Sequence, residues 1–167
     1  MPTPSFAEVV DILHEIAPLE LAAEWDNVGV LLQPRSRPGT VRRVLLTIDL
    51  TAAVAKEASA ARADLLVAYH PPIFQPLKRL AAGDGKQGPL LALAAAGIAV
   101  YSPHTALDAA PSGLGDWLAE QVLAGDAPKE LRPWGAGAVG RRGAGGRARA
   151  GGPHGPRGPR RGGGGRR

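Results

Sequence analysis

The sequence predicts an α/β protein, a mostly parallel sheet with helices on both faces. Three apolar runs, at 41–49, 64–69 and 98–101, alternate with segments of helical periodicity. Alternation of strands and helices is typical of a parallel sheet with right-handed crossovers. The second and third runs lead into prolines and the histidines His70 and His104, which places both rings at carboxyl ends of strands, where open sheets bind ligands.

The N-terminal elements follow from capping and turn signals. An S-x-x-E capping box at Ser5 predicts an amphipathic helix over 6–16. We expect a short second helix over 18–23, a turn over 24–29 and a short strand over 30–32. The first helix should pack its apolar side on the core.

Three residues of the predicted turn are of interest, and two of them have two interpretations. Trp25 is expected to be a core anchor, because aromatic side chains are buried more often than not. Asp26 and Asn27 are ordinary turn residues by type. They would line a site if their loop faces the ends of the strands.

The later elements are predicted in the same way. Thr51 should be the N-cap of an Ala-rich helix. Residues 73–88 form a loop long enough to act as a mobile lid. A helix over 89–96 ends at Gly97, a residue typical of C-caps, and a last helix spans about 112–124.

Composition divides the chain into a domain at 1–134 and a tail at 135–167. The tail has 31 Gly, Ala, Arg or Pro among 33 residues, so we expect it to be disordered. Its nine arginines account for the positive net charge, because 1–134 holds 11 basic and 15 acidic residues. We favour a frame or splice artefact, since a GC-rich message read out of frame gives this composition. The alternative is a nucleic-acid arm that binds phosphates non-specifically.

Several classes of function are excluded or disfavoured by what the sequence lacks. The absence of cysteine excludes a disulfide scaffold, a thiolate zinc site and a cysteine nucleophile. There is no Walker A loop and no G-x-S-x-G elbow. No segment has the pattern of a leader peptide or the length of a membrane span. We expect a soluble intracellular protein with no membrane partner.

The residues with catalytic or ligand chemistry are His70, His104 and Asp108. Imidazole nitrogen and carboxylate oxygen both bind divalent metals, and a His-x3-Asp pair would bring two ligands from one loop. Asp49 and Tyr69 are further candidates to line such a site. Two alternatives remain open: the histidines bond only to backbone at turns, or His70 is the general base of a metal-free hydrolase.

Three motifs together resemble the NIF-three-like family (Ngg-one-interacting-factor-three-like, also named GTP cyclohydrolase I type 2). They are EWDNVG at 24–29, YHPPIF at 69–74 and YSPHTALDAAP at 101–111. The resemblance covers about 5–125, and the wording of the second and third motifs is most similar to the animal branch.

The resemblance implies a dinuclear metal site in an α/β fold and assembly into homo-oligomers. It implies that His70 and Asp108 are metal ligands and that His104 is a ligand or a close neighbour. Many bacterial members have histidine where this chain has Tyr69. This departure from the family pattern argues against the binding of two metal ions at the site. The family's remaining ligands, a histidine and a glutamate, belong to a C-terminal half that we expect to be missing here.

We therefore expect a metal-binding protein with a half-encoded site for divalent ions, such as zinc, iron or manganese, that is not catalytically competent alone. The resemblance implies a site like that of a metal-dependent hydrolase, but the motifs do not decide whether the protein is an enzyme. The alternative is an interaction module that acts as a transcriptional corepressor without metal chemistry, as the resemblance to animal members implies. The expected location is the cytoplasm, with the nucleus as a second one.

Overall fold

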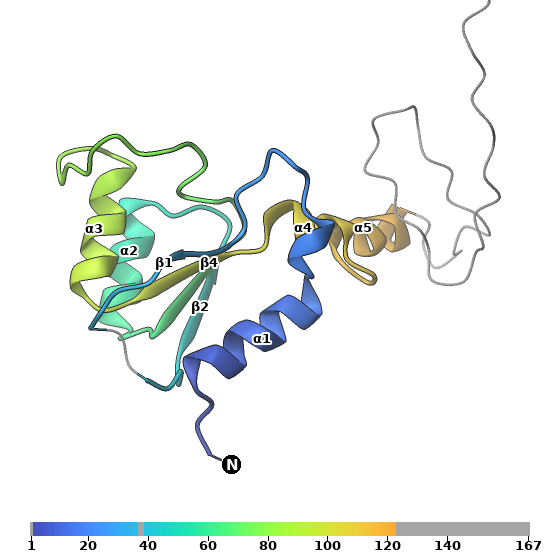
Figure 1. Ribbon diagram of the computed structural model, residues 1–167, viewed down its shortest axis with the longest axis horizontal. Coiled ribbons are helices and arrows are strands. Elements are labelled where there is room, and N and C mark those ends of the chain that lie inside the picture. Colours follow the sequence, from blue (N-terminus) through green and yellow to red (C-terminus); the bar gives the residue numbers. More distant parts are fainter. Residues whose placement is uncertain (1, 37–38, 123–167) are drawn as a thin grey trace, which may run out of the picture.

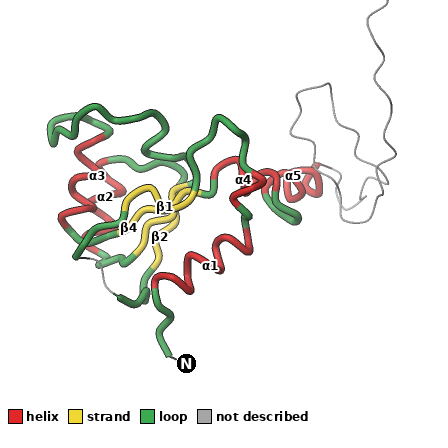
Figure 2. Tube along the Cα trace, viewed as in Figure 1, coloured by secondary structure: helices red, strands yellow, loops and turns green. Residues whose placement is uncertain are grey.

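A four-stranded sheet between helices forms the body of the protein in the computed structural model, which describes residues 2–36 and 39–122 (Figures 1 and 2). The strands are β1 (Gly29–Leu32), β2 (Val44–Thr47), β3 (Leu65–Ala68) and β4 (Ala99–Ser102), in the sheet order β1-β4-β3-β2. The helices are α1 (Phe6–Ile16), α2 (Ala52–Ala60), α3 (Gln87–Ala95), α4 (His104–Ala109) and α5 (Leu114–Val122), with a 3-10 turn at Leu19–Leu21.

Helices cover both faces of the sheet, which confirms the predicted α/β class. On one face α2 and α3 lie side by side (Figure 1), and Ala58 and Leu93 pack there against Leu66 and Val100. On the other face α1 packs Phe6 against the opposite sides of β3 and β4. These two hydrophobic clusters lie on opposite faces of the sheet and shield its central strands from water. The hydrophobic effect is the main driving force for this arrangement.

The sheet is mixed: β2, β3 and β4 are parallel, and β1 runs antiparallel to β4. Gly29 at the start of β1 pairs with Ser102 at the end of β4. The predicted turn at 24–29 therefore enters the sheet beside the carboxyl ends of the parallel strands. This pairing brings the first motif to the third.

Local signals in the sequence explain where the helices begin. The Ser5 hydroxyl accepts a hydrogen bond from the Glu8 N–H at 3.2 Å, and the Glu8 carboxylate accepts one from the Ser5 N–H at 2.7 Å. The Thr51 hydroxyl caps α2 by accepting from the Val54 N–H at 3.2 Å. Both caps satisfy N–H groups that have no partner within a helix, as predicted.

Gly97 follows α3 with φ +75°, the left-handed backbone conformation that glycine adopts readily. A Cβ at this position would lie 3.2 Å from the Ser36 carbonyl oxygen. Glycine at this helix end is therefore favoured by the backbone conformation, and a side chain there would also crowd Ser36.

Burial differs between the central and edge strands. β4 is buried along its whole length, as predicted for a strand covered on both faces. The edge strand β2 is covered on one face only. Leu45 packs on the side of α2 and α3, whereas Leu46, on the other face, is 76% exposed. β2 is also shorter than the predicted strand over 41–49.

One predicted loop is a helix. Residues 104–108 were expected to supply two ligands from a loop, but α4 begins at His104 and includes Asp108. Proline at 103 is compatible with a helix start, because its missing N–H would have no partner there. The spacing of His104 and Asp108 by four residues therefore places them on one side of a helix.

Two further points concern the extent of the chain. None of the helices in the described ranges is long and apolar enough to cross a membrane. The tail predicted at 135–167 lies outside the described residues.

Candidate functional site

The carboxyl ends of the three parallel strands converge on a group of polar side chains, as predicted. Asp49 follows β2, His70 follows β3 and His104 follows β4. His70 Nδ1 lies 2.9 Å from Asp49 Oδ1, and the two imidazole rings are 5.8 Å apart between centroids, nearly perpendicular to each other. Two histidines from separate strands thus share one edge of the sheet.

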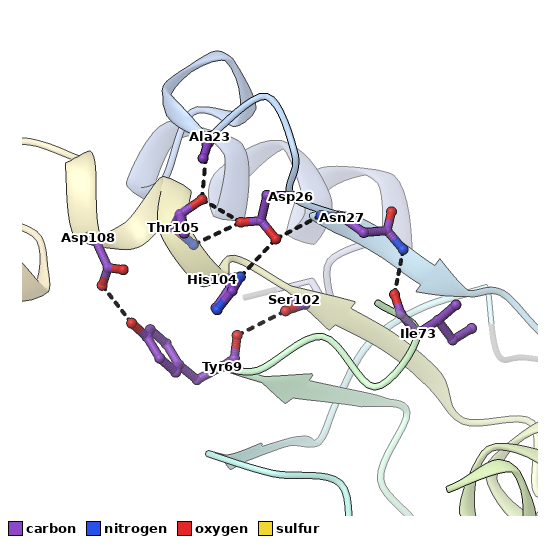
Figure 3. Close-up of polar contacts among 9 residues, drawn as sticks. All are labelled: Ala23, Asp26, Asn27, Tyr69, Ile73, Ser102, His104, Thr105 and Asp108. Atoms are coloured by element: carbon purple, nitrogen blue, oxygen red, sulfur yellow. Dashed lines mark hydrogen bonds and ion pairs between the residues drawn. The ribbon is translucent and has the colours of Figure 1, made fainter. Parts of the chain in front are cut away.

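Asp26 lies at the centre of a hydrogen-bond network, drawn in Figure 3. Its Oδ1 is 2.8 Å from His104 Nδ1 and accepts from the Asn27 N–H at 2.7 Å. Its Oδ2 accepts from the N–H and the hydroxyl of Thr105. Burial opposes ionisation, but these hydrogen bonds together outweigh it and hold the pKa of Asp26 below its ordinary value.

Asp108 bonds to Tyr69 (Figure 3). The phenol oxygen of Tyr69 donates to Asp108 Oδ1 at 2.6 Å. Burial, together with the nearby Asp108 carboxylate, raises the pKa of Tyr69 far above its ordinary value. Tyr69 is therefore a neutral donor, and one oxygen of Asp108 is already occupied.

Aromatic rings surround His104. Trp25, Tyr69 and Phe74 have ring centroids 5.8 to 6.4 Å from the His104 ring, all edge-on. The expectation that Trp25 anchors the core is wrong, because its side chain is 65% exposed. Its loop lies at the strand ends rather than over a sheet face, so Trp25 forms part of the rim of the site.

Two further hydrogen bonds to backbone hold these loops together. The buried hydroxyl of Ser102 donates to the Tyr69 carbonyl oxygen at 2.9 Å. The side-chain amide of Asn27 donates to the Ile73 carbonyl oxygen. Asn27 thus connects the first motif to the second.

The sequence interpretation missed three contributors: Ser102, Thr105 and Phe74. All three lie inside the motifs at 69–74 and 101–111, so proximity to the histidines was the available signal. Nothing in the type of Thr105 predicts its two bonds to Asp26, since that contact joins segments 79 positions apart in the chain.

A cavity of about 400 Å³ opens beside His70. Its walls include Leu50, Phe74 and Leu90, and Asp49 and Lys86 contribute charge. A volume of this size is within the range of small-molecule sites. His70 therefore lies between the polar group at the strand ends and a cavity able to admit a small molecule.

The donor chemistry fits part of a metal site. Each histidine has a carboxylate at Nδ1, the arrangement that orients metal-binding imidazoles in proteins. However, the described residues contain no group of three or more His, Asp or Glu side chains that could hold an ion. His70, His104 and Asp108 lie at the same edge, but they do not form a complete ligand set by themselves.

The family model described as Duf34/NIF3 (NGG1p interacting factor 3) matches residues 4–144. NIF3-like protein 1 of Drosophila melanogaster is 46% identical over 116 residues, which is 70% of this chain and 39% of that protein. NGG1-interacting factor 3 of Saccharomyces cerevisiae is 41% identical over 109 residues, which is 61% of this chain and 38% of that protein.

Solved structures show the same relationship. A Bacillus cereus protein related to NIF3 superposes with a TM-score of 0.66 at 30% identity, over 74% of this chain and 33% of that one. Reduced HcgD from Methanocaldococcus jannaschii superposes with a TM-score of 0.63 at 28% identity, over 72% of this chain and 47% of that one. The chain thus spans less than half the length of these relatives.

Proposed function

Because the chain belongs to the Duf34/NIF3 family, we propose that it binds a divalent metal ion through His70, His104 and Asp108 and supplies one half of a larger metal site. Zinc, iron and manganese are the candidate ions, since imidazole and carboxylate together suit all three. The proposal includes assembly into a homo-oligomer and residence in the cytoplasm and nucleus.

One observation carries the proposal: two histidine rings lie 5.8 Å apart at the ends of neighbouring strands, each with a carboxylate at Nδ1. An imidazole held in this way presents its other nitrogen to an ion. Strand ends are also stiff, which suits ligands that have to be preorganised.

A bound ion would polarise a substrate oxygen or activate water. Three protein ligands or more are usual in catalytic sites for zinc. Because the described residues provide fewer than three in ligand geometry, further ligands would have to come from outside the described part of this chain, from another chain or from a longer form of the protein. We therefore propose that this chain alone binds metal weakly and does not catalyse a reaction.

Replacing His70, His104 and Asp108 together with alanine should abolish binding of zinc and manganese at this edge. The measurement is equilibrium dialysis of the full chain against each ion, followed by elemental analysis. A His14→Ala variant is the control for loss of a histidine, because His14 lies on α1 beside Tyr101 and is not one of the proposed ligands. If the triple variant retains the metal content of the wild type, the proposed site is wrong.

A second function is favoured by a separate observation. The relative in Saccharomyces cerevisiae is named for its interaction with NGG1, and this chain exposes the apolar side chains Val44, Leu46 and Ile48 at alternate positions along and just beyond β2. Exposed apolar surface of this kind marks interaction sites. We propose as the alternative that the chain is a module that binds transcriptional regulators. Under that alternative, the triple alanine variant should still bind its partner and repress normally.

A further inference from the structure

We propose that Asp26 is a positioning residue that fixes the tautomer of His104. In this arrangement His104 carries its proton on Nδ1 and keeps the lone pair on Nε2. The Nδ1 atom faces Asp26, and the other ring nitrogen points away from it (Figure 3). The role of His104 as a metal ligand rests on the proposed function, whereas the tautomer does not.

The Asp26 carboxylate is surrounded by four polar groups: two backbone N–H groups, one hydroxyl and the His104 ring. Its Oδ1 accepts from the Asn27 N–H, and its Oδ2 accepts from the Thr105 N–H. A backbone N–H can only donate, so both carboxylate oxygens have to be acceptors. If either oxygen carried a proton, that proton would face a backbone N–H group, which is itself a donor. Both oxygens are therefore unprotonated.

His104 shares Oδ1 with the Asn27 N–H, at 2.8 Å from its Nδ1. Since that oxygen has no proton to give, the ring nitrogen facing it has to be the donor. A neutral imidazole with its proton on Nδ1 has its lone pair on Nε2. The hydrogen bonds thus dictate which nitrogen is available to an ion or a proton.

Burial and backbone conformation make this contact rigid. The Asp26 side chain has no exposed surface, and that of His104 is 18% exposed. His104 also has φ +31°, a left-handed backbone conformation that side chains other than glycine rarely adopt. Such conformations persist where the surroundings hold them, and here the bonds from Asp26 to His104 and Thr105 do so.

The second histidine–carboxylate pair lacks these constraints and provides a matched control. His70 and Asp49 make a contact of similar length, 2.9 Å, but their side chains are 50% and 64% exposed. Water can therefore compete for either partner. Removing the Asp49 carboxylate should leave the tautomer of His104 unchanged.

The test is nuclear magnetic resonance of the full chain with isotope-labelled histidine. Long-range proton–nitrogen correlations distinguish a protonated ring nitrogen from one with a lone pair. Spectra are recorded at rising pH until the ring-nitrogen signals stop changing, so that the rings are neutral. The His104 signals are identified by their loss in a His104→Gln variant. Samples are wild type, Asp26→Asn and Asp49→Asn, each titrated with zinc chloride.

We expect the wild type and Asp49→Asn to show a proton on Nδ1 of His104. In Asp26→Asn the amide group can donate to the ring, so the form with the proton on Nε2 should gain population. Zinc affinity should fall about 10- to 100-fold in Asp26→Asn, the usual effect of losing such a partner.

A proton on Nε2 of His104 in the wild type would overturn the inference, and this result does not depend on whether Asp26→Asn folds. An unchanged tautomer in a folded Asp26→Ala variant, measured in the same way, would overturn it as well, because alanine can neither accept from the ring nor donate to it. If the tautomer is as expected but zinc leaves the His104 signals unmoved, the inference stands and the proposed metal function fails.

Discussion

Replacing Tyr69 with histidine is expected to raise the affinity of the chain for zinc at least about tenfold, which is ~1.4 kcal/mol of binding free energy. In the wild type, Tyr69 donates to Asp108 Oδ1 and occupies an oxygen that an ion would need. The substitution removes this donor and adds an imidazole beside His70. It would thus supply the ligand that the described residues lack.

Isothermal titration of zinc into the Tyr69→His and wild-type chains measures this difference. A Tyr69→Phe variant is the matched control, because it frees Asp108 without adding a nitrogen ligand. Its affinity should lie between the other two. Equal affinity for all three chains would contradict a metal site that includes Asp108.

Replacing Leu66 with alanine should lower the free energy of unfolding by about 2–5 kcal/mol, the usual cost of a Leu→Ala cavity in a packed core. Leu66 lies in the centre of β3 with no exposed surface, in contact with the cluster formed by α2, α3 and β4. The protein interior cannot close over the lost volume without disturbing both helices. Urea denaturation monitored by circular dichroism gives the value.

The same substitution at Leu46 is the control. Leu46 lies on the neighbouring strand and is 76% exposed, so its replacement should change stability by no more than about 0.5 kcal/mol. A large loss at Leu46 would show that a partner covers this face of β2 in solution. A small loss at Leu66 would contradict the packing described for the sheet.

Much of the fold could be predicted from the sequence because its signals are local. The capping box at Ser5, the hydroxyl of Thr51 and the glycine at 97 each act within a few residues. The continuous apolar runs of β3 and β4 likewise report burial on both faces. Because His70 and His104 come directly after these runs, their position at one edge of the sheet could be predicted as well.

The remainder depends on contacts between distant segments. The antiparallel pairing of β1 with β4 brings Asp26 to His104 across 78 positions of the chain, and no local pattern specifies it. The exposure of Trp25 follows from the same pairing, so a rule based on average aromatic burial failed there. The short helix α4 was missed because a proline before His104 resembles a loop signal as much as a helix start.

The three motifs that resemble the family lie together in the structure, at the carboxyl ends of the parallel strands. The motifs at 24–29, 69–74 and 101–111 form one connected network through Asp26, Tyr69 and their partners. The chain also spans less than half of the relatives' length. The partial metal site proposed above, completed by a longer chain or a second chain, would account for both findings.

The most direct test of this account is to add manganese to the labelled full chain and record which signals broaden, because this paramagnetic ion broadens nuclei close to it. The account predicts that the first additions broaden His70, His104 and Asp108 while Ala63 and Gly97, which precede β3 and β4 at the opposite end of the sheet, stay sharp. Broadening spread over the acidic side chains elsewhere, or none at all, would contradict a metal site at this edge of the sheet.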